Sequence, residues 1–430
     1  MLTALIGFAI TFALIFLRVP IAIALGSVGF FGFWYFTNQT PALSMIALTT
    51  RNTTMSYTLA VVPLFILMGN LVAGAGISRE LYRAAQVFIG HRKGGLAMAT
   101  IISCGGFAAV CGSSVATAVT MGRVSIPEMR SYGYADSLST ATVAAGGTLG
   151  ILIPPSIIMV VYGITTDTHI GKLFAAGLLP GLLGIITLSL AVRWTVFRDP
   201  STAPQAGRST RAERVHAISR VWTVAALFFL VLGGIYGGYF TATEAGGIGA
   251  AGALFFALAR GLSLKQFYDI FTDTVQTSAA LFALIIGAHI FTQFVNYTGA
   301  HVAILELVND GGLSPFMVMM TIVLIYIVLG CVLDSLAMML LTLPMFFPIV
   351  VGLGYDPVWF GILVVVLVEL GMITPPLGIN LFILRSIAPE VKLITIIKGI
   401  VPFVVTDIFR VAFIALVPAF TLFLPNLLFP

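Results

Sequence analysis

The sequence has 430 residues, of which 59% are hydrophobic and 9% are charged, and its formal net charge is +5. Apolar runs long enough to cross a bilayer recur along the whole chain, which excludes a soluble globular protein and predicts an all-α polytopic membrane protein. The basic residues lie in connecting segments, so the positive charge does not indicate a nucleic-acid partner. The three cysteines lack metal-ligand spacing, so we expect neither a disulfide framework nor a transition-metal site.

Hydropathy predicts ten membrane-spanning segments, five in each half of the chain. In the first half they are 2–17, 20–36, 57–76, 134–163 and 171–195, and in the second half 221–240, 243–260, 274–297, 357–385 and 399–424. The first run lacks a basic leader and a small-residue cleavage site and ends at Arg18. It is therefore expected to be a retained span and not a signal peptide.

Two further apolar segments, about 94–122 and about 314–350, are interrupted near their middles by small or polar residues. The interruptions are Cys111-Gly-Ser-Ser114 and Gly330-Cys-Val-Leu-Asp-Ser335. We interpret both segments as helical hairpins that enter the membrane and return to the same side. With a periplasmic amino terminus, this topology puts nearly all of the 21 Lys and Arg residues on the cytoplasmic side, as the positive-inside rule requires.

Two of the predicted spans carry a double proline. They contain Gly150-Ile-Leu-Ile-Pro-Pro-Ser156 and Gly371-Met-Ile-Thr-Pro-Pro-Leu377. Proline lacks the N–H and collides with the carbonyl one turn earlier, so both helices should break and leave carbonyls free. Irregular backbone at membrane depth survives only inside protein or beside a polar cavity, and paired broken helices indicate the binding site of a transporter.

The polar stretch 198–220 is predicted to be a cytoplasmic linker between two units, 1–197 and 221–430. Each unit has three spans, a hairpin, a broken span and a closing span. Because five crossings is an odd number, the second unit must enter the membrane upside down, which makes the pair an inverted-topology repeat. The distance from hairpin tip to double proline is nearly the same in both units.

Four motifs indicate a resemblance to a known family. They are Cys111-Gly-Ser-Ser-Val-Ala-Thr117 with Ile126-Pro-Glu-Met129, the first double-proline motif, Gly237-Gly-Tyr-Phe-Thr-Ala-Thr-Glu-Ala245, and the second double-proline motif continued to Asn380. Over essentially its whole length the chain resembles the large membrane (M) subunit of the tripartite ATP-independent periplasmic (TRAP) transporters, within the ion transporter superfamily. The resemblance implies an elevator-type importer of a carboxylate-bearing organic solute, driven by a sodium gradient, in the bacterial inner membrane. It also implies two partners, a small four-helix membrane subunit and a periplasmic substrate-binding protein.

Backbone carbonyls at helix breaks suit a hard cation, and the amino ends of half-helices favour a carboxylate. Each half can form one such cation-binding site between a helix break and a hairpin tip, which we call a corner. The first corner has Gly150 and Ile153 facing the first hairpin tip, and the second has Gly371 and Thr374 facing the second tip. The resemblance implies that the cation is sodium and that the corners include further residues. The expected sodium-binding residues, mainly through their backbone, are Ala108, Cys111, Gly150, Ile153, Pro155, Gly330, Gly371, Thr374 and Leu377. Ala108 and Cys111 stand where relatives often carry serine, so they offer carbonyls without a hydroxyl.

The candidate substrate-binding residues are polar side chains at the hairpin tips and after the second break. They are Ser113, Ser114, Thr117, Asp334, Ser335 and Asn380. A structural role competes with each of these assignments, because helical hydroxyls often bond the preceding turn and an acid can cap a half-helix. For the intramembrane residues Glu369, Asp407 and Arg410 the sequence leaves both a functional and a structural role open.

The hairpins and broken helices are expected to move, against a scaffold formed by the spans near 20–76 and 221–260. Other function classes are less well supported. An intramembrane enzyme is disfavoured because no paired aspartates, HExxH or serine–lysine arrangement occurs in the spans. A channel is disfavoured because inverted repeats with broken helices indicate alternating access. The main alternative is a stand-alone sodium- or proton-coupled dicarboxylate or citrate carrier of the same superfamily.

Overall fold

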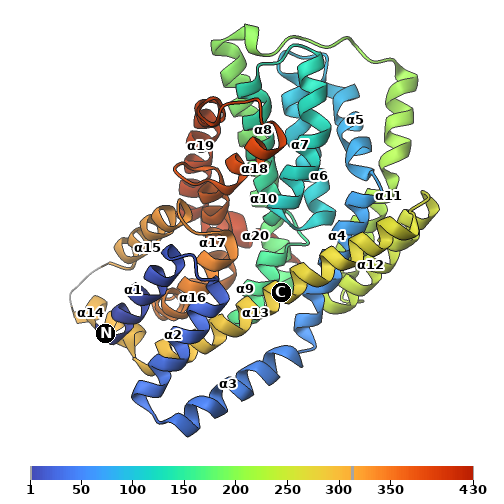
Figure 1. The fold of residues 1–430 in the computed structure, drawn as a ribbon. Coiled ribbons are helices and arrows are strands. Elements are labelled where there is room, and N and C mark those ends of the chain that lie inside the picture. The colour runs from blue at the N-terminus through green and yellow to red at the C-terminus, as the bar shows by residue number, and fades with distance from the viewer. Residues whose placement is uncertain (1, 311–313, 430) are drawn as a thin grey trace.

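The structure is a computed structural model that describes residues 2–310 and 314–429, which are helical almost throughout and contain no strand (Figure 1). The first half comprises α1 (Leu2–Phe16), α2 (Ile21–Phe36), α3 (Gln39–Thr54), α4 (Val61–Gly74), α5 (Ile77–Ile89), α6 (Gly95–Cys111), α7 (Ser114–Ser131), α8 (Asp136–Thr148), α9 (Ile157–Thr165) and α10 (Ile170–Arg198). The second half comprises α11 (Arg211–Tyr236), α12 (Ala242–Ala259), α13 (Leu264–Tyr297), α14 (Ala300–Asp310), α15 (Pro315–Gly330), α16 (Ser335–Gly352), α17 (Pro357–Ile373), α18 (Ile379–Ile387), α19 (Leu393–Leu416) and α20 (Pro418–Leu428). Short 3₁₀ turns precede α4 and follow α8 and α10.

Six of the described helices are individually long and apolar enough to cross a membrane, namely α10, α11, α12, α13, α16 and α19. A seventh candidate is the pair formed by α3 and the 58–74 helix, which is bent by 57°. Further apolar helices are shorter, among them α6, α15 and α17, each of which forms one arm of a hairpin or of a break predicted at a double proline. The predicted all-α multi-pass class is confirmed.

The helices form two bundles. In the central bundle, the hairpin α6–α7 packs on α8, the hairpin α15–α16 packs on α17, and α10 packs along α19. In the flanking bundle, α2 packs along α13, and α4 packs along α12. Every residue of α17 from Val358 to Ile373 is buried, as expected for an apolar helix surrounded by others.

Three of the differences between the structure and the predicted elements have a clear local cause. Segment 37–56, expected to be a connection, contains α3, whose threonines and Arg51 hide it from a hydropathy scan. The end of the expected linker is already helical because Thr210 and Glu213 form a capping box that starts α11. The expected span 399–424 is two helices, since Pro418 cannot continue α19.

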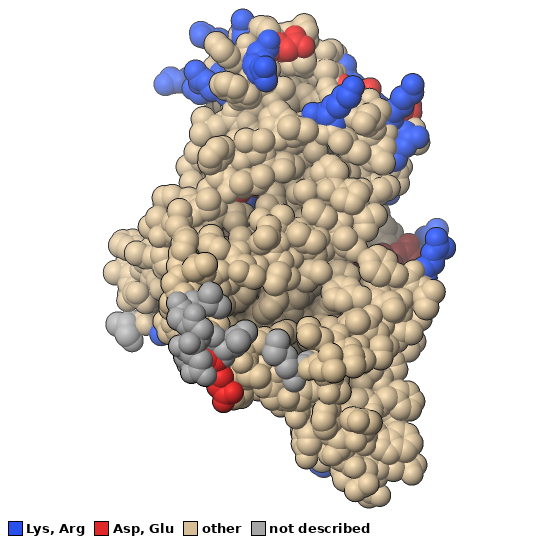
Figure 2. Space-filling view, turned by 90° about the vertical axis from the view of Figure 1, so that its left-hand side faces the viewer, with Lys and Arg blue, Asp and Glu red and all other residues tan. Residues whose placement is uncertain are grey.

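Lys and Arg side chains gather at one end of the molecule. Figure 2 shows them at the upper end, where the segment between α10 and α11 lies in Figure 1, while the middle of the visible face is nearly free of charge. A charge-poor belt below a basic end is the surface that a bilayer-spanning protein requires.

Candidate functional site

The first hairpin tip contacts the first broken helix through backbone. Gly112 has the left-handed φ of 65°, and Ser113 caps α7 by accepting the N–H of Ala116 at 3.3 Å. The carbonyl of Gly112 accepts the N–H of Ile157 at 3.4 Å. A Cβ atom at Gly112 would lie 2.7 Å from the carbonyl oxygen of Pro155. Glycine is therefore required here by both conformation and space.

The first break leaves carbonyls without backbone donors. The N–H groups of Leu152 and Ile153 both donate to the carbonyl of Leu149, at 3.2 and 3.1 Å. Within the described residues, no N–H donates to the carbonyls of Gly150, Ile153 or Pro155. The carbonyl of Ala108, by contrast, accepts the N–H of Gly112 at 3.2 Å.

The backbone of Gly150 lies directly against the hairpin tip. A Cβ atom added to Gly150 would collide with the carbonyl of Ser113 and lie 2.7 Å from the Thr117 hydroxyl oxygen. Cys111 ends α6 at the same tip and is buried. Of the predicted first corner, Cys111, Gly150 and Pro155 therefore lie around one oxygen-rich contact between the hairpin tip and the break.

The second hairpin tip meets the second break at two glycines. A Cβ atom at Gly371 would lie 2.6 Å from the Cα atom of Gly330, so the two backbones touch. Asp334 caps α16 by accepting the N–H groups of Leu336 and Ala337 at 3.0 and 3.1 Å. This cap supplies a structural role for the predicted substrate-binding carboxylate.

The two breaks differ in the hydrogen bonding of their backbone carbonyls. The carbonyl of Gly371, expected to be free, accepts the N–H of Thr374 at 3.2 Å, because the last turn of α17 tightens. The Thr374 hydroxyl donates to the carbonyl of Leu370 at 2.6 Å, which leaves its oxygen lone pairs available. Leu377 is 44% exposed, so the second break is more open than the first.

The predicted substrate residues divide into two groups. Asn380 is buried and donates from Nδ2 to the Ser114 hydroxyl at 3.1 Å and to the carbonyl of Ala144 at 3.0 Å. The Thr117 hydroxyl donates to the carbonyl of Ser113 at 2.7 Å. Ser113, Ser114, Thr117 and Asn380 therefore cluster at the first tip. Within the described residues, no hydrogen bond joins Asp334 or Ser335 to this cluster.

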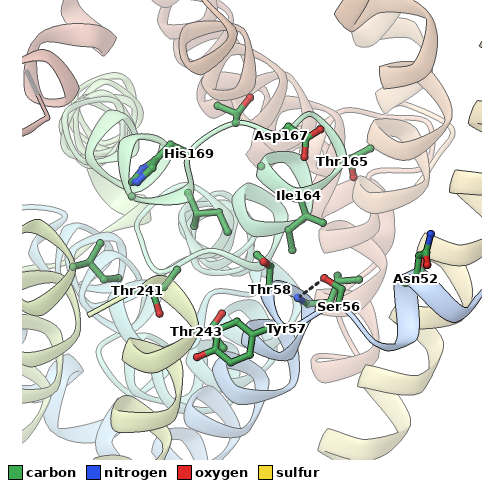
Figure 3. A pocket seen from close by; sticks show the side chains of 18 of the residues that line it. Asn52, Ser56, Tyr57, Thr58, Ile164, Thr165, Asp167, His169, Thr241 and Thr243 are labelled. Carbon is green, nitrogen blue, oxygen red and sulfur yellow. Dashed lines mark hydrogen bonds between the residues drawn. The ribbon is translucent and has the colours of Figure 1, made fainter. Parts of the chain in front are cut away.

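A polar cavity of about 1000 Å³ lies at the other end of α9 from the first corner. Figure 3 shows part of its wall, which comes from the end of α3 and the segment that leads into α4, the α9–α10 connection and the start of α12. Hydroxyl and amide side chains dominate, including Asn52, Ser56, Thr58, Thr165 and Thr243. The cavity therefore lies between the central and the flanking bundle.

The cavity lining includes no Lys or Arg among the described residues. His169 accepts the N–H of Lys172 at 3.1 Å and so caps α10, and burial, followed by the nearby Lys172 charge, lowers the pKa of His169. Without a fixed cation in its wall, the cavity suits passage of a polar solute better than tight binding of an anion.

Sequence reasoning did not identify this cavity. Many of its polar residues belong to three segments predicted as connections, each unremarkable by itself, while His289 and Gln293 lie on α13. The available signal is that the predicted topology puts all three on the periplasmic side, so their hydroxyl-rich stretches face the same compartment.

Comparison with known proteins gives a consistent result. The family model described as "Tripartite ATP-independent periplasmic transporter, DctM component" matches residues 8–420. The C4-dicarboxylate TRAP transporter large permease protein DctM of Pseudomonas aeruginosa is 35% identical over 89% of each chain. The sialic acid permease SiaM of Vibrio cholerae is 31% identical over 96% of each chain, and the ectoine permease TeaC of Halomonas elongata is 32% identical over 97%. Among solved structures, the YdaH transporter of Alcanivorax borkumensis shares the fold, with a TM-score of 0.62, 16% identity and 89% coverage of each chain.

Proposed function

The chain belongs to the family of the DctM component of the tripartite ATP-independent periplasmic transporters, and on this premise we propose that it couples import of a carboxylate-bearing organic solute to a sodium gradient. It is a multi-pass transport protein of the bacterial inner membrane and not an enzyme. The observation that carries the coupling proposal is the pair of helix breaks, each held against a hairpin tip by glycine backbone.

The first corner offers oxygen ligands of the kind that a sodium ion requires. The carbonyls of Gly150, Ile153 and Pro155 lack backbone partners in the described residues, and Gly150 and Pro155 lie beside the tip of the first hairpin. Neutral oxygens at a helix break suit a monovalent hard cation. In the second corner, the Thr374 oxygen and the backbone of Gly330 and Gly371 take the corresponding roles. Both ions are cargo that moves with the solute.

The solute carboxylate is proposed to bind beside the first corner. Ser113 and Ser114 lie at the amino end of α7, where the helix dipole and free N–H groups favour an anion. Thr117 and Asn380 line the same cluster. The Ser114–Asn380 hydrogen bond must open or rearrange for either side chain to contact the solute. The names of the relatives specify different solutes, so the proposal is limited to a carboxylate-bearing organic acid.

The two partner proteins of a tripartite system complete the proposal. A periplasmic binding protein is proposed to deliver the solute to the cavity near Thr58 and Thr165, and a small four-helix subunit to cover the flanking bundle. The hairpins and broken helices of the central bundle move relative to the flanking bundle in this proposal, as in an elevator. The wall of the cavity supports it, because both bundles contribute to that wall.

Reconstitution in liposomes tests this function. The chain, its small subunit and the binding protein together are expected to accumulate solute only when sodium is high outside. Omission of the binding protein should abolish uptake. Uptake of free solute by the chain alone would instead support the stand-alone carrier of the same superfamily, and uptake without sodium dependence would contradict the ion coupling.

A further inference from the structure

A groove of about 590 Å³ lies on the surface of the central bundle, between the last turns of α10 and the first half of α19. We call it the α10–α19 groove. Large apolar side chains in its wall are between 46% and 80% exposed. They are Leu190, Trp194 and Phe197 on α10, and Val401 and Val405 on α19. A continuous exposed apolar patch marks contact with a membrane or with another protein.

The apolar surface continues from the groove toward the start of α10. Leu182, Ile186, Leu190 and Trp194 recur every four residues, so they share one face of the helix, and each is more than half exposed. We call this row of side chains the apolar stripe. From Leu182 to Trp194 the helix rises about 18 Å, whereas half of the hydrocarbon core of a bilayer is about 15 Å thick. The apolar stripe is therefore long enough to contact one acyl chain along its whole length.

Basic side chains border the α10–α19 groove. Arg193 and Arg198 line it, and both are exposed. Lys398 of α19 is also exposed and lies three residues before Val401, so the two share a helix face. Among the described residues, none of these three cations lies within ion-pair distance of an acid. The groove therefore carries uncompensated positive charge.

The acids of the two helices and of the residue that follows α10 are engaged elsewhere. Helix α10 contains no Asp or Glu, and α19 contains one, Asp407, which is buried and lies 3.2 Å from Arg410. Asp199, which follows α10, accepts the N–H of Ser201 at 3.1 Å and its hydroxyl at 2.6 Å through Oδ1. A negatively charged ligand in the groove would therefore meet cations without a competing carboxylate from these segments.

The cations lie at the depth of lipid headgroups. Arg198 ends α10, where the segment at the basic end of the molecule begins (Figure 1). Arg193 lies about 7.5 Å deeper along the helix axis, and Trp194 follows it. Tryptophan is enriched at the interface between membrane and water, and a guanidinium binds phosphate through two parallel N–H groups. A phosphate at this level would place its acyl chains along the apolar stripe.

The chemistry of the groove favours a lipid over a protein as its occupant. Helices α10 and α19 belong to the central bundle, whereas the small subunit is proposed to cover the flanking bundle. Apolar side chains at membrane depth with cations at the membrane edge match the two parts of an anionic phospholipid. A zwitterionic lipid matches less well, because the arginines repel its ammonium group.

We propose that the α10–α19 groove binds an anionic phospholipid of the leaflet at the basic end of the molecule. Its phosphate contacts Arg193 and Arg198, and one acyl chain lies along the apolar stripe. Lys398 adds a third positive charge on the α19 side. The proposal rests on the membrane location of the chain and not on which ion or solute the chain carries.

Photo-cross-linking in lipid nanodiscs tests the proposal. The probes are phosphatidylglycerol and phosphatidylcholine with a photoactivatable acyl chain, each at the same low mole fraction in phosphatidylcholine discs that hold the full chain and its small subunit. Mass spectrometry then measures the labelling of peptides from 182–198 and 401–408. Phosphatidylglycerol is expected to label these peptides about 5- to 30-fold more than phosphatidylcholine, the range that one to two arginines provide near a membrane surface.

Two variants separate the headgroup site from the apolar site. Arg193→Gln combined with Arg198→Gln should reduce phosphatidylglycerol labelling to the level of phosphatidylcholine. Val405→Trp keeps both arginines but fills the groove, so it should also lower phosphatidylglycerol labelling of the α10 peptide. The labelling by phosphatidylcholine reports whether each variant is still folded and embedded in the disc.

The matched control is Arg208→Gln combined with Arg211→Gln. It removes the same charge from two exposed positions at the same end of the molecule, neither of which lines the groove, and labelling should be unchanged. Equal labelling of the wild type by both probes overturns the proposal, as does unchanged labelling in Val405→Trp. An equal loss in both double variants would indicate general attraction to the surface and would also overturn it. Labelling that occurs only when the small subunit is omitted would assign the groove to that protein instead.

Discussion

The Thr374 hydroxyl gives the sharpest test of the second cation corner. In Thr374→Val the side chain keeps its shape and loses one oxygen. The hydroxyl proton already goes to the carbonyl of Leu370 at 2.6 Å, so the oxygen lone pairs are what a cation would use. Loss of one such neutral ligand in a half-buried site is worth about 1–3 kcal/mol. The sodium concentration for half-maximal uptake should therefore rise roughly 5- to 150-fold.

The assay is solute uptake into proteoliposomes at a series of external sodium concentrations. Thr374→Ser restores the oxygen and should recover most of the sodium affinity. Thr195→Val is the matched control, since its half-buried hydroxyl also donates to the carbonyl four residues earlier but lies near the end of α10. A sodium titration of Thr374→Val that coincides with that of Thr195→Val would refute the role of this oxygen.

Three further outcomes follow from the geometry. Gly371→Ala should destabilise the protein by about 1–3 kcal/mol, because the new methyl group collides with the backbone of Gly330. The control in calorimetry is Gly247→Ala, whose added Cβ lies 3.9 Å from its nearest neighbour. Equal melting temperatures of the two variants would contradict the close contact. Asn52→Cys should react with a membrane-impermeant maleimide added from the periplasmic side, and lack of labelling beyond that of the unsubstituted chain would show that the cavity does not open there. Because the pKa of His169 is lowered in the folded protein, this residue stabilises the fold above the ordinary histidine pKa of about 6.5, and the stabilisation is lost as pH falls through the lowered pKa. The melting temperature of His169→Asn should therefore fall less between pH 7 and pH 5 than that of the wild type. Parallel plots of melting temperature against pH for the two proteins would refute this.

The local breaks were predictable from sequence because their causes are local. Pro154 and Pro375 lack the N–H that an intact helix needs, and Gly112 has no Cβ to oppose a left-handed turn. These effects act within one helical turn and do not depend on the rest of the fold. The chain order of most of the apolar helices followed from hydropathy in the same way.

The contacts between distant segments were not predictable from such rules. Nothing in the sequence around Asn380 indicates that its amide bonds Ser114, because the two are 266 positions apart. Likewise, whether the Gly371 carbonyl accepts a hydrogen bond depends on how tightly the last turn of α17 closes, which the double proline alone does not determine. Surface helices such as α3 were missed since their mixed composition resembles that of a loop.

The Ser114–Asn380 bond has a consequence for how the two halves of the chain act together. Ser114 belongs to the first hairpin, whereas Asn380 begins the second half of the broken helix that forms the other corner. Both groups are buried, so separating them without a replacement partner would leave unsatisfied polar atoms, at about 1–3 kcal/mol for each. A solute carboxylate placed between the hydroxyl and the amide would supply that partner. In the proposed function, this hydrogen bond joins the first corner to the second half of the chain, and binding of the solute carboxylate would be the event that allows the two segments to part at low cost.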